Sequence, residues 1–225
     1  MDQAVEAFTV MLMISNGLFS YKGFTSRQFY EKHLFWVRKI TEGGESLRIL
    51  SSGFLHANWA HLIFNMLALY SFSVEVGRAV GLMKFIVIYF ASLTGGNLLA
   101  LFFNRDNPDY RAVGASGAVC GVIFASILYF PDSSIYILFL PIAIPSWLFG
   151  IGFILISIYG IKSRFGNLGH EAHLGGAIIG IAVSVLFNPA LLTRRLSVII
   201  MLVVPISVFL YLLVRHPSVL GGGRR

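Results

Sequence analysis

The sequence has few charged residues and a single cysteine. Asp, Glu, Lys and Arg make up 12% of its 225 residues, about half of the roughly 25% that is typical of soluble domains. Because 56% of the residues are hydrophobic, no single soluble core could bury them all, and lipid must be part of the solvent. The lone cysteine, Cys120, excludes a disulfide within the chain. These shortages exclude a soluble bundle or repeat protein and favour an integral membrane protein.

Charged residues divide the chain into seven apolar stretches. Asp, Glu, Lys and Arg are absent from Ala7–Tyr21, Ile49–Val74, Phe85–Asn104, Ala112–Pro131, Ser133–Ile161, Leu174–Thr193 and Leu196–Val214. A membrane-spanning helix needs about 20 mostly apolar residues. We therefore predict an all-α, polytopic helical membrane bundle with seven transmembrane helices. It forms one integral-membrane domain over residues 1–225, with a core at about 4–188 and an extra C-terminal helix at about 196–214.

The net charge of +7 resides mostly in loops and at the chain ends. Attraction to anionic lipid headgroups accounts for this placement, so we expect the bilayer as a partner and no nucleic acid. Of the 17 basic residues, thirteen lie on the face where the even-numbered helices begin. The positive-inside rule would make that face cytoplasmic.

Polar groups gather at the starts of the second, fourth and sixth predicted helices. They are His56, His61 and Asn65, then Gly114-Ala115-Ser116-Gly117, then His170 and His173. Even-numbered helices cross the membrane in the same direction, so their starts share one face. Strongly polar side chains within membrane spans are costly and usually functional. We therefore expect these groups to converge on one cavity.

The residue types in this cluster are those of a serine nucleophile with its base. A serine hydroxyl attacks a carbonyl well only when a nearby base takes its proton, and His173 is suited to that role. Donors for a developing oxyanion are available from the Ser116 N–H, His61 and the Asn65 amide. Every Asp lies at a chain end or in a loop, so we expect a dyad rather than a triad.

Each of these residues also has an ordinary structural explanation. A serine in a GxSG turn is most often a turn or cap residue, and a lone buried histidine usually satisfies a local hydrogen bond. Small residues spaced by four, such as Gly117 with Gly121 and Gly176 with Gly180, commonly serve helix packing alone. Their joint occurrence at one end of three helices that run in one direction favours catalysis.

At these positions the sequence resembles the rhomboid family of intramembrane serine proteases. The matching segments are Leu47-Arg48, His56 to Asn65, Gly114 to Gly121, and Ala172-His173-Leu174-Gly175-Gly176. The resemblance covers about Arg48 to Asn188, in matching order and spacing, and is closest to bacterial members. One helix then follows the six-helix core.

The resemblance implies a role for each matched residue. Ser116 would be the nucleophile and His173 the general base, while His61, Asn65 and the Ser116 N–H would form the oxyanion hole. The residues that would shape the site are Gly114, Gly117, Cys120, His56 and His170. Cys120 stands where many members carry a tyrosine that stacks on the catalytic histidine, so His173 is expected to be held less firmly.

The resemblance also implies where and on what the protein acts. It would cleave transmembrane segments of other membrane proteins, without metal or other cofactor, as a multi-pass protein of the bacterial inner membrane. Its active site would open away from the cytoplasm, which conflicts with the charge distribution, and its oligomeric state stays open. The segment Gly160–Gly169 would cap the site.

Two alternatives remain at this stage. The first is a rhomboid-like protein without catalytic activity that binds and escorts membrane proteins, although such relatives usually lack the serine or the histidine. The second is a metal-dependent membrane protein that uses His56, His61, His170 and His173 as ligands. Against the second, residues 170–173 read HExH rather than the HExxH of zinc proteases.

Overall fold

A computed structural model describes residues 3–136, 142–163 and 169–215 of the chain. The helices are α1 (Gln3–Thr25), α2 (Arg27–His33), α3 (Val37–Thr41), α4 (Arg48–Ser51), the 3₁₀ turn η1 (Ser52–Phe54), α5 (Trp59–Val80), α6 (Leu82–Asn104), α7 (Ser116–Tyr129), α8 (Ser146–Ser163), α9 (His170–Phe187), α10 (Leu191–Arg194) and α11 (Leu196–Arg215). The strands are β1 (Phe35–Trp36), β2 (Arg111–Ala112), β3 (Ser134–Tyr136) and β4 (Ala143–Pro145).

The predicted polytopic helical bundle is confirmed. Five helices, α1, α5, α6, α8 and α9, are long and apolar enough to cross a membrane, and α7 and α11 are shorter apolar helices. Each of the seven charge-free stretches overlaps one of these helices. The C-terminal α11 packs against α8, and its buried face carries Val198, Leu202, Ile206 and Phe209.

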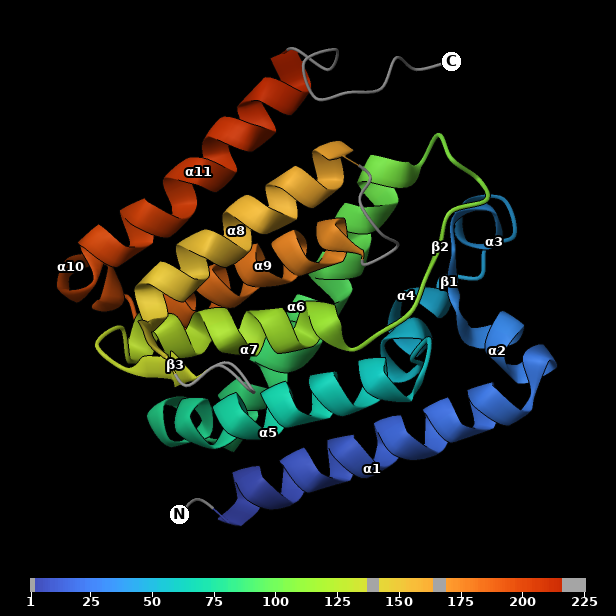
Figure 1. Ribbon diagram of the computed structural model, residues 1–225, viewed down its shortest axis with the longest axis horizontal. Coiled ribbons are helices and arrows are strands. Elements are labelled where there is room, and N and C mark those ends of the chain that lie inside the picture. The colour runs from blue at the N-terminus through green and yellow to red at the C-terminus, as the bar shows by residue number, and fades with distance from the viewer. Residues whose placement is uncertain (1–2, 137–141, 164–168, 216–225) are drawn as a thin grey trace.

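Helix α7 lies at the centre of the bundle and contacts α5, α6 and α9 (Figure 1). Every residue from Gly117 to Leu128 is buried. Its 14 residues span about 21 Å, which is less than the roughly 30 Å of a hydrocarbon core. Helices α5, α7 and α9 all begin at the same end of the bundle (Figure 1). The polar residues at these three helix starts therefore share one end of the molecule, as the sequence predicts.

Small residues let α7 and α9 approach each other closely. A β-carbon at Gly176 would overlap the carbonyl oxygen of Gly117, and one at Gly180 would overlap that of Gly121. Helix α6 joins the same contact, because a β-carbon at Gly96 would lie 2.5 Å from the Ala172 carbonyl oxygen. Glycine at these positions permits backbone contact between neighbouring membrane helices.

The segment between α1 and α5 folds back on the connection that leads into α7. Strand β1 pairs with β2 in antiparallel fashion, Phe35 opposite Ala112 and Trp36 opposite Arg111. This pairing was not predicted, because two-residue strands have no periodicity to detect. It ties the 26–55 segment to the chain that immediately precedes Ser116.

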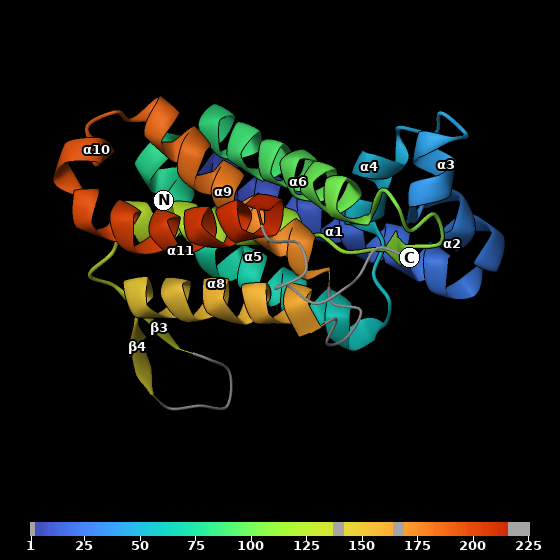
Figure 2. The same cartoon turned by 90° about the horizontal axis from the view of Figure 1, so that it is seen from above.

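The structure adds two details to the chain on either side of α8. The predicted apolar stretch Ser133–Ile161 begins with a β3–β4 hairpin, which projects from the bundle beside the start of α8 (Figure 2). Helix α8 continues to Ser163, so the first four residues of the expected Gly160–Gly169 cap are helical. Residues 164–168 of that expected cap lie outside the described residues.

Candidate active site

Ser116 and His173 lie within hydrogen-bond distance of each other. The His173 Nε2 atom is 2.8 Å from the Ser116 Oγ atom. Ser116 is the first residue of α7 and His173 lies in the first turn of α9, so the glycine contacts between these helices determine the separation. A hydroxyl this close to an imidazole nitrogen has the geometry of a nucleophile with its base.

The loop before Ser116 depends on Gly114. Its φ of +135° is a backbone conformation that glycine adopts readily and other residues rarely do. The Gly114 N–H donates to the Ser52 carbonyl oxygen at 3.0 Å. This bond anchors the turn that brings the serine to the start of α7.

His61 lies over this turn. The Ala57 N–H donates to its Nδ1 atom at 3.4 Å, so the neutral ring carries its proton on Nε2. A β-carbon built on Gly114 would be 2.9 Å from that Nε2 and 3.5 Å from the Ser116 Oγ. The Nε2–H donor and the serine hydroxyl thus face the same small space, where an oxyanion would need a donor.

Asn65 lies one turn further along α5 and is 7% exposed. Its amide nitrogen donates one hydrogen bond to the His61 carbonyl oxygen at 2.9 Å. A side-chain amide has two N–H donors, so this bond fixes the side chain and leaves the second donor available.

A small cavity adjoins the serine. Its volume is about 20 Å³, and its lining residues are Ser52, Asn97, Ala112, Val113, Gly114, Ser116, Gly169 and Ala172. This is enough space for about one water molecule. A water there would lie beside Ser116.

His173 is flanked by two rings, and one of these neighbours was not predicted. The Phe153 ring of α8 lies 5.9 Å from the His173 ring, and the His170 ring lies 5.9 Å away on another side at 79°. Cys120 is buried in α7. The sequence does not identify Phe153, because one phenylalanine among 20 carries no signal of which helix it will face.

We expect Phe153→Ala to lower the rate of a reaction that uses the Ser116–His173 pair, such as the peptide cleavage that the resemblance implies, roughly three- to tenfold. An aromatic contact contributes about 0.5–1.5 kcal/mol, and loss of this one would let the imidazole leave its position near Ser116. Steady-state cleavage kinetics measure the effect, with Phe149→Ala in the same helix as the matched control. Equal losses in both variants would mean that Phe153 acts only through packing of α8.

His56 links α1 to the turn before Ser116. The Ala115 N–H lies 3.5 Å from its Nε2, and its Nδ1 lies 2.9 Å from the Ser20 hydroxyl, which donates to the Phe54 carbonyl oxygen at 3.1 Å. Since Nε2 accepts, Nδ1 carries the proton and donates to Ser20. Ser20, His56 and Ala115 are all fully buried. Ser20 was missed at the sequence level, because a serine in an apolar helix is common and usually bonds its own backbone.

The buried His56 predicts a pH-dependent stability. Burial, with a smaller contribution from nearby His61, lowers the pKa of His56 to about 3, below the ordinary value near 6.5. Between these two values the unfolded chain binds the extra proton, so the free energy of unfolding falls as pH decreases. The slope is at most about 1.4 kcal/mol per pH unit.

Thermal unfolding in detergent at pH 7.5 and 5.5 tests this dependence. We expect His56→Gln to be less stable than the native chain at pH 7.5 and to lose less on acidification. Equal losses in the two proteins would assign the acid sensitivity to other groups.

The four histidines considered as metal ligands do not form one cluster. His56 and His61 have ring centroids 5.0 Å apart, and His170 and His173 form a second pair at 5.9 Å. Within the described ranges, no three His, Cys, Asp or Glu side chains are placed to hold one metal ion. The metal-dependent alternative therefore has no ligand group to support it in that part of the chain.

The fold and this site define a polytopic membrane protein with a serine–histidine pair at the start of its central helix. Comparison with known sequences then identifies the family: the Rhomboid domain matches residues 43–190, and the chain belongs to the rhomboid family. This match includes every residue of the site described above except Ser20.

Individual relatives cover different parts of the chain. Rhomboid protease GluP of Bacillus subtilis is 33% identical over 181 residues, 78% of this chain and 33% of GluP. Rhomboid protease AarA of Providencia stuartii is 30% identical over 177 residues, 67% of this chain and 59% of AarA. The mitochondrial Rhomboid protein 1 of Saccharomyces cerevisiae is 30% identical over 138 residues, 60% of this chain and 40% of that protein. The chain thus spans between a third and three fifths of the length of these relatives.

Proposed function

We propose that the protein is an intramembrane serine endopeptidase that cleaves transmembrane segments of other membrane proteins. The observation that carries the proposal is the 2.8 Å separation of His173 Nε2 and Ser116 Oγ at the start of a short, central, buried helix. Two relatives, GluP and AarA, are named as rhomboid proteases. The chain retains both residues of the pair, which argues against an escort protein without catalytic activity.

In this mechanism the Ser116 oxygen attacks the scissile carbonyl carbon while His173 Nε2 takes the hydroxyl proton. The resulting oxyanion accepts hydrogen bonds from the Ser116 N–H and His61 Nε2–H, and from the free Asn65 N–H. His173 then gives its proton to the departing amine. A water molecule, deprotonated by His173, attacks the acyl ester and releases a carboxylate and the free serine.

Two of the relatives are bacterial and others are mitochondrial, so two membranes come into question for this protein. We propose the bacterial inner membrane, since GluP aligns with the largest share of this chain among the three relatives described above. Transmembrane proteins of that membrane would be the substrates.

Cleavage of a fluorescent transmembrane reporter tests the proposed function. The purified chain is reconstituted in liposomes with the reporter, with and without a chelator, and the products are identified by mass. We expect one cleavage within the membrane segment, unaffected by the chelator. Intact reporter that co-purifies with the chain across several substrates would favour the escort function instead, and chelator sensitivity would contradict the serine mechanism.

A further inference from the structure

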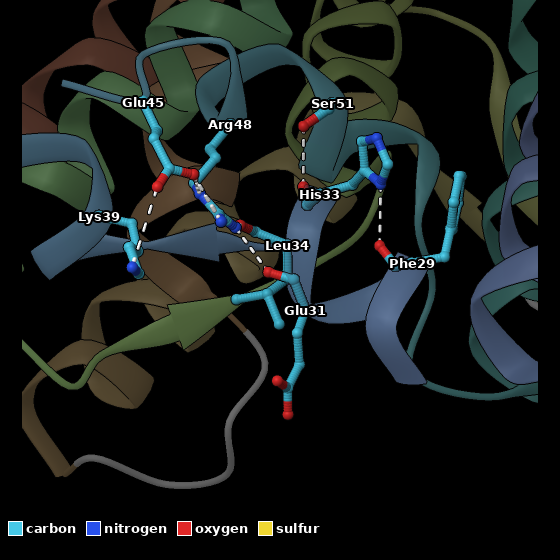
Figure 3. Close-up of polar contacts among 8 residues, drawn as sticks. All are labelled: Phe29, Glu31, His33, Leu34, Lys39, Glu45, Arg48 and Ser51. Carbon is cyan, nitrogen blue, oxygen red and sulfur yellow. Dashed lines mark hydrogen bonds and ion pairs between the residues drawn. The ribbon is translucent and has the colours of Figure 1, made fainter. Parts of the chain in front are cut away.

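A cleft separate from the candidate active site lies between the end of α1 and the α2–α4 segment. Its volume is about 660 Å³, within the range of ligand pockets of roughly 300–1,000 Å³. The lining residues are Phe19, Lys32, His33, Gly44, Glu45, Ser46, Leu47, Arg48, Leu50, Ser51 and Phe54. Figure 3 shows the polar contacts that build its wall.

The polar wall is held by Arg48, which is 5% exposed. Its guanidinium donates to the Glu45 carboxylate at 2.7 and 2.8 Å and to the carbonyl oxygens of Glu31 and Leu34 at 2.8 and 2.9 Å (Figure 3). Glu45 also pairs with Lys39 at 4.0 Å. Arg48 and Glu45 therefore both have partners, and this wall of the cleft is rigid before any ligand binds.

The charge left over at the cleft is positive. The lining holds Lys32 and Arg48 and one carboxylate, that of Glu45, which leaves an excess of one positive charge. Lys32 is exposed and, within the described residues, makes no hydrogen bond or ion pair. An anionic group is the natural complement of this free ammonium.

The cleft also has an apolar lining of Phe19, Leu47, Leu50 and Phe54. Phe19 and Phe54 lie at 6.0 Å between ring centroids, and Leu47 is 81% exposed. Nearby, Tyr21 and Trp59 pack together at the same end of the bundle. Exposed Tyr and Trp side chains are typical of the membrane–water interface. This pair indicates that the end of the bundle that carries the cleft is close to the membrane–water interface.

We propose that this cleft binds one anionic phospholipid. The phosphate lies at the Lys32 ammonium, and an acyl chain lies along Leu47, Leu50 and the two phenylalanines. Charge complementarity selects the headgroup, and the apolar wall accepts the chain. Nothing in this binding requires proteolysis.

A bound lipid would stabilise the candidate active site through a short series of hydrogen bonds. Ser51, in the cleft wall, bonds the His33 carbonyl oxygen at 2.8 Å. Its neighbour Ser52 accepts the Gly114 N–H at 3.0 Å, and Gly114 lies two residues before the serine. Asn97 holds the same turn by donating to the Ile49 carbonyl oxygen at 2.6 Å. Lipid occupancy thus supports the turn that carries the nucleophile.

Native mass spectrometry of the full chain measures the binding directly. The protein in neutral detergent is titrated with phosphatidylglycerol or with phosphatidylcholine of the same acyl chains. We expect one phosphatidylglycerol to be retained in preference, and Lys32→Gln to weaken its retention about fivefold. The matched control is Lys22→Gln, which removes an exposed charge near the end of α1 but does not line the cleft.

Three outcomes would overturn the proposal. Equal retention of the two lipids would mean that the headgroup is not recognised. Equal weakening by both lysine variants would mean diffuse surface attraction. Displacement of the lipid by an equimolar transmembrane peptide would assign the cleft to a protein segment.

The stabilising effect of the lipid on the candidate active site rests on the proposed protease function, and it is measured separately. In liposomes containing phosphatidylglycerol, we expect cleavage by Lys32→Gln to fall several-fold while Lys22→Gln is unchanged. A lipid that binds without altering cleavage would contradict the stabilising effect and leave the lipid-binding proposal standing. Failure of the native chain to cleave would affect the protease proposal and leave the lipid-binding result intact.

Discussion

Ser116→Ala and His173→Ala are each expected to abolish cleavage of a transmembrane reporter, with a loss of at least roughly 10³-fold. Alanine at position 116 removes the attacking oxygen. Alanine at position 173 removes the base that lies 2.8 Å from it, and a neutral serine hydroxyl is a poor nucleophile. Because the two residues act in one step, the double variant should lose no more than either single variant. Initial cleavage rates in liposomes provide the measurement.

The controls for this prediction separate chemistry from folding. Ser71→Ala removes another helix hydroxyl, one that is exposed and, among the described residues, bonds only the Leu67 carbonyl oxygen. The rate of this variant should match that of the native chain. Thermal unfolding of each variant should show that the bundle is intact. Persistent cleavage by folded Ser116→Ala would mean that another residue is the nucleophile, and it would contradict the proposed mechanism.

The helical bundle was predictable because its physical cause is local. A charge-free stretch of about 20 residues has to satisfy its backbone internally once it lies in lipid, and a helix does so. The charged residues between stretches therefore mark most helix ends to within six residues, although α5 begins ten residues after Ile49. The long fifth stretch, Ser133–Ile161, was less clear, since it contains both the β3–β4 hairpin and the first part of α8.

The candidate site was predictable only in part. Ser116, His173, His61 and Asn65 all lie in the first two turns of helices that run in the same direction, so topology alone brings them to one end. Contacts that depend on how helices rotate against each other were not predictable. Phe153 beside His173 and Ser20 beside His56 are of this kind, because their residue types are common in membrane helices and their partners lie far away in the chain.

Gly176→Ala is expected to destabilise the bundle and to lower cleavage roughly 100-fold. The added β-carbon would overlap the Gly117 carbonyl oxygen, and neither backbone can yield without moving α7 away from α9. Overpacking of this kind costs about 1–3 kcal/mol. A displacement near 1 Å between Ser116 and His173 would account for the loss of rate. Thermal unfolding and kcat, measured on the same preparation, test both effects.

Gly152→Ala is the matched control for this prediction. It also adds one β-carbon to a glycine within a membrane helix, but no atom of the described chain outside its immediate neighbours lies within 4 Å of the added carbon. Alanine favours helix over glycine by up to about 1 kcal/mol, so this variant should be at least as stable as the native chain and equally active. If Gly176→Ala behaved like Gly152→Ala, close approach of α7 and α9 would not be what holds His173 against Ser116. A folded Gly176→Ala variant with low activity would instead show that glycine at the helix contact serves the chemistry as well as the packing.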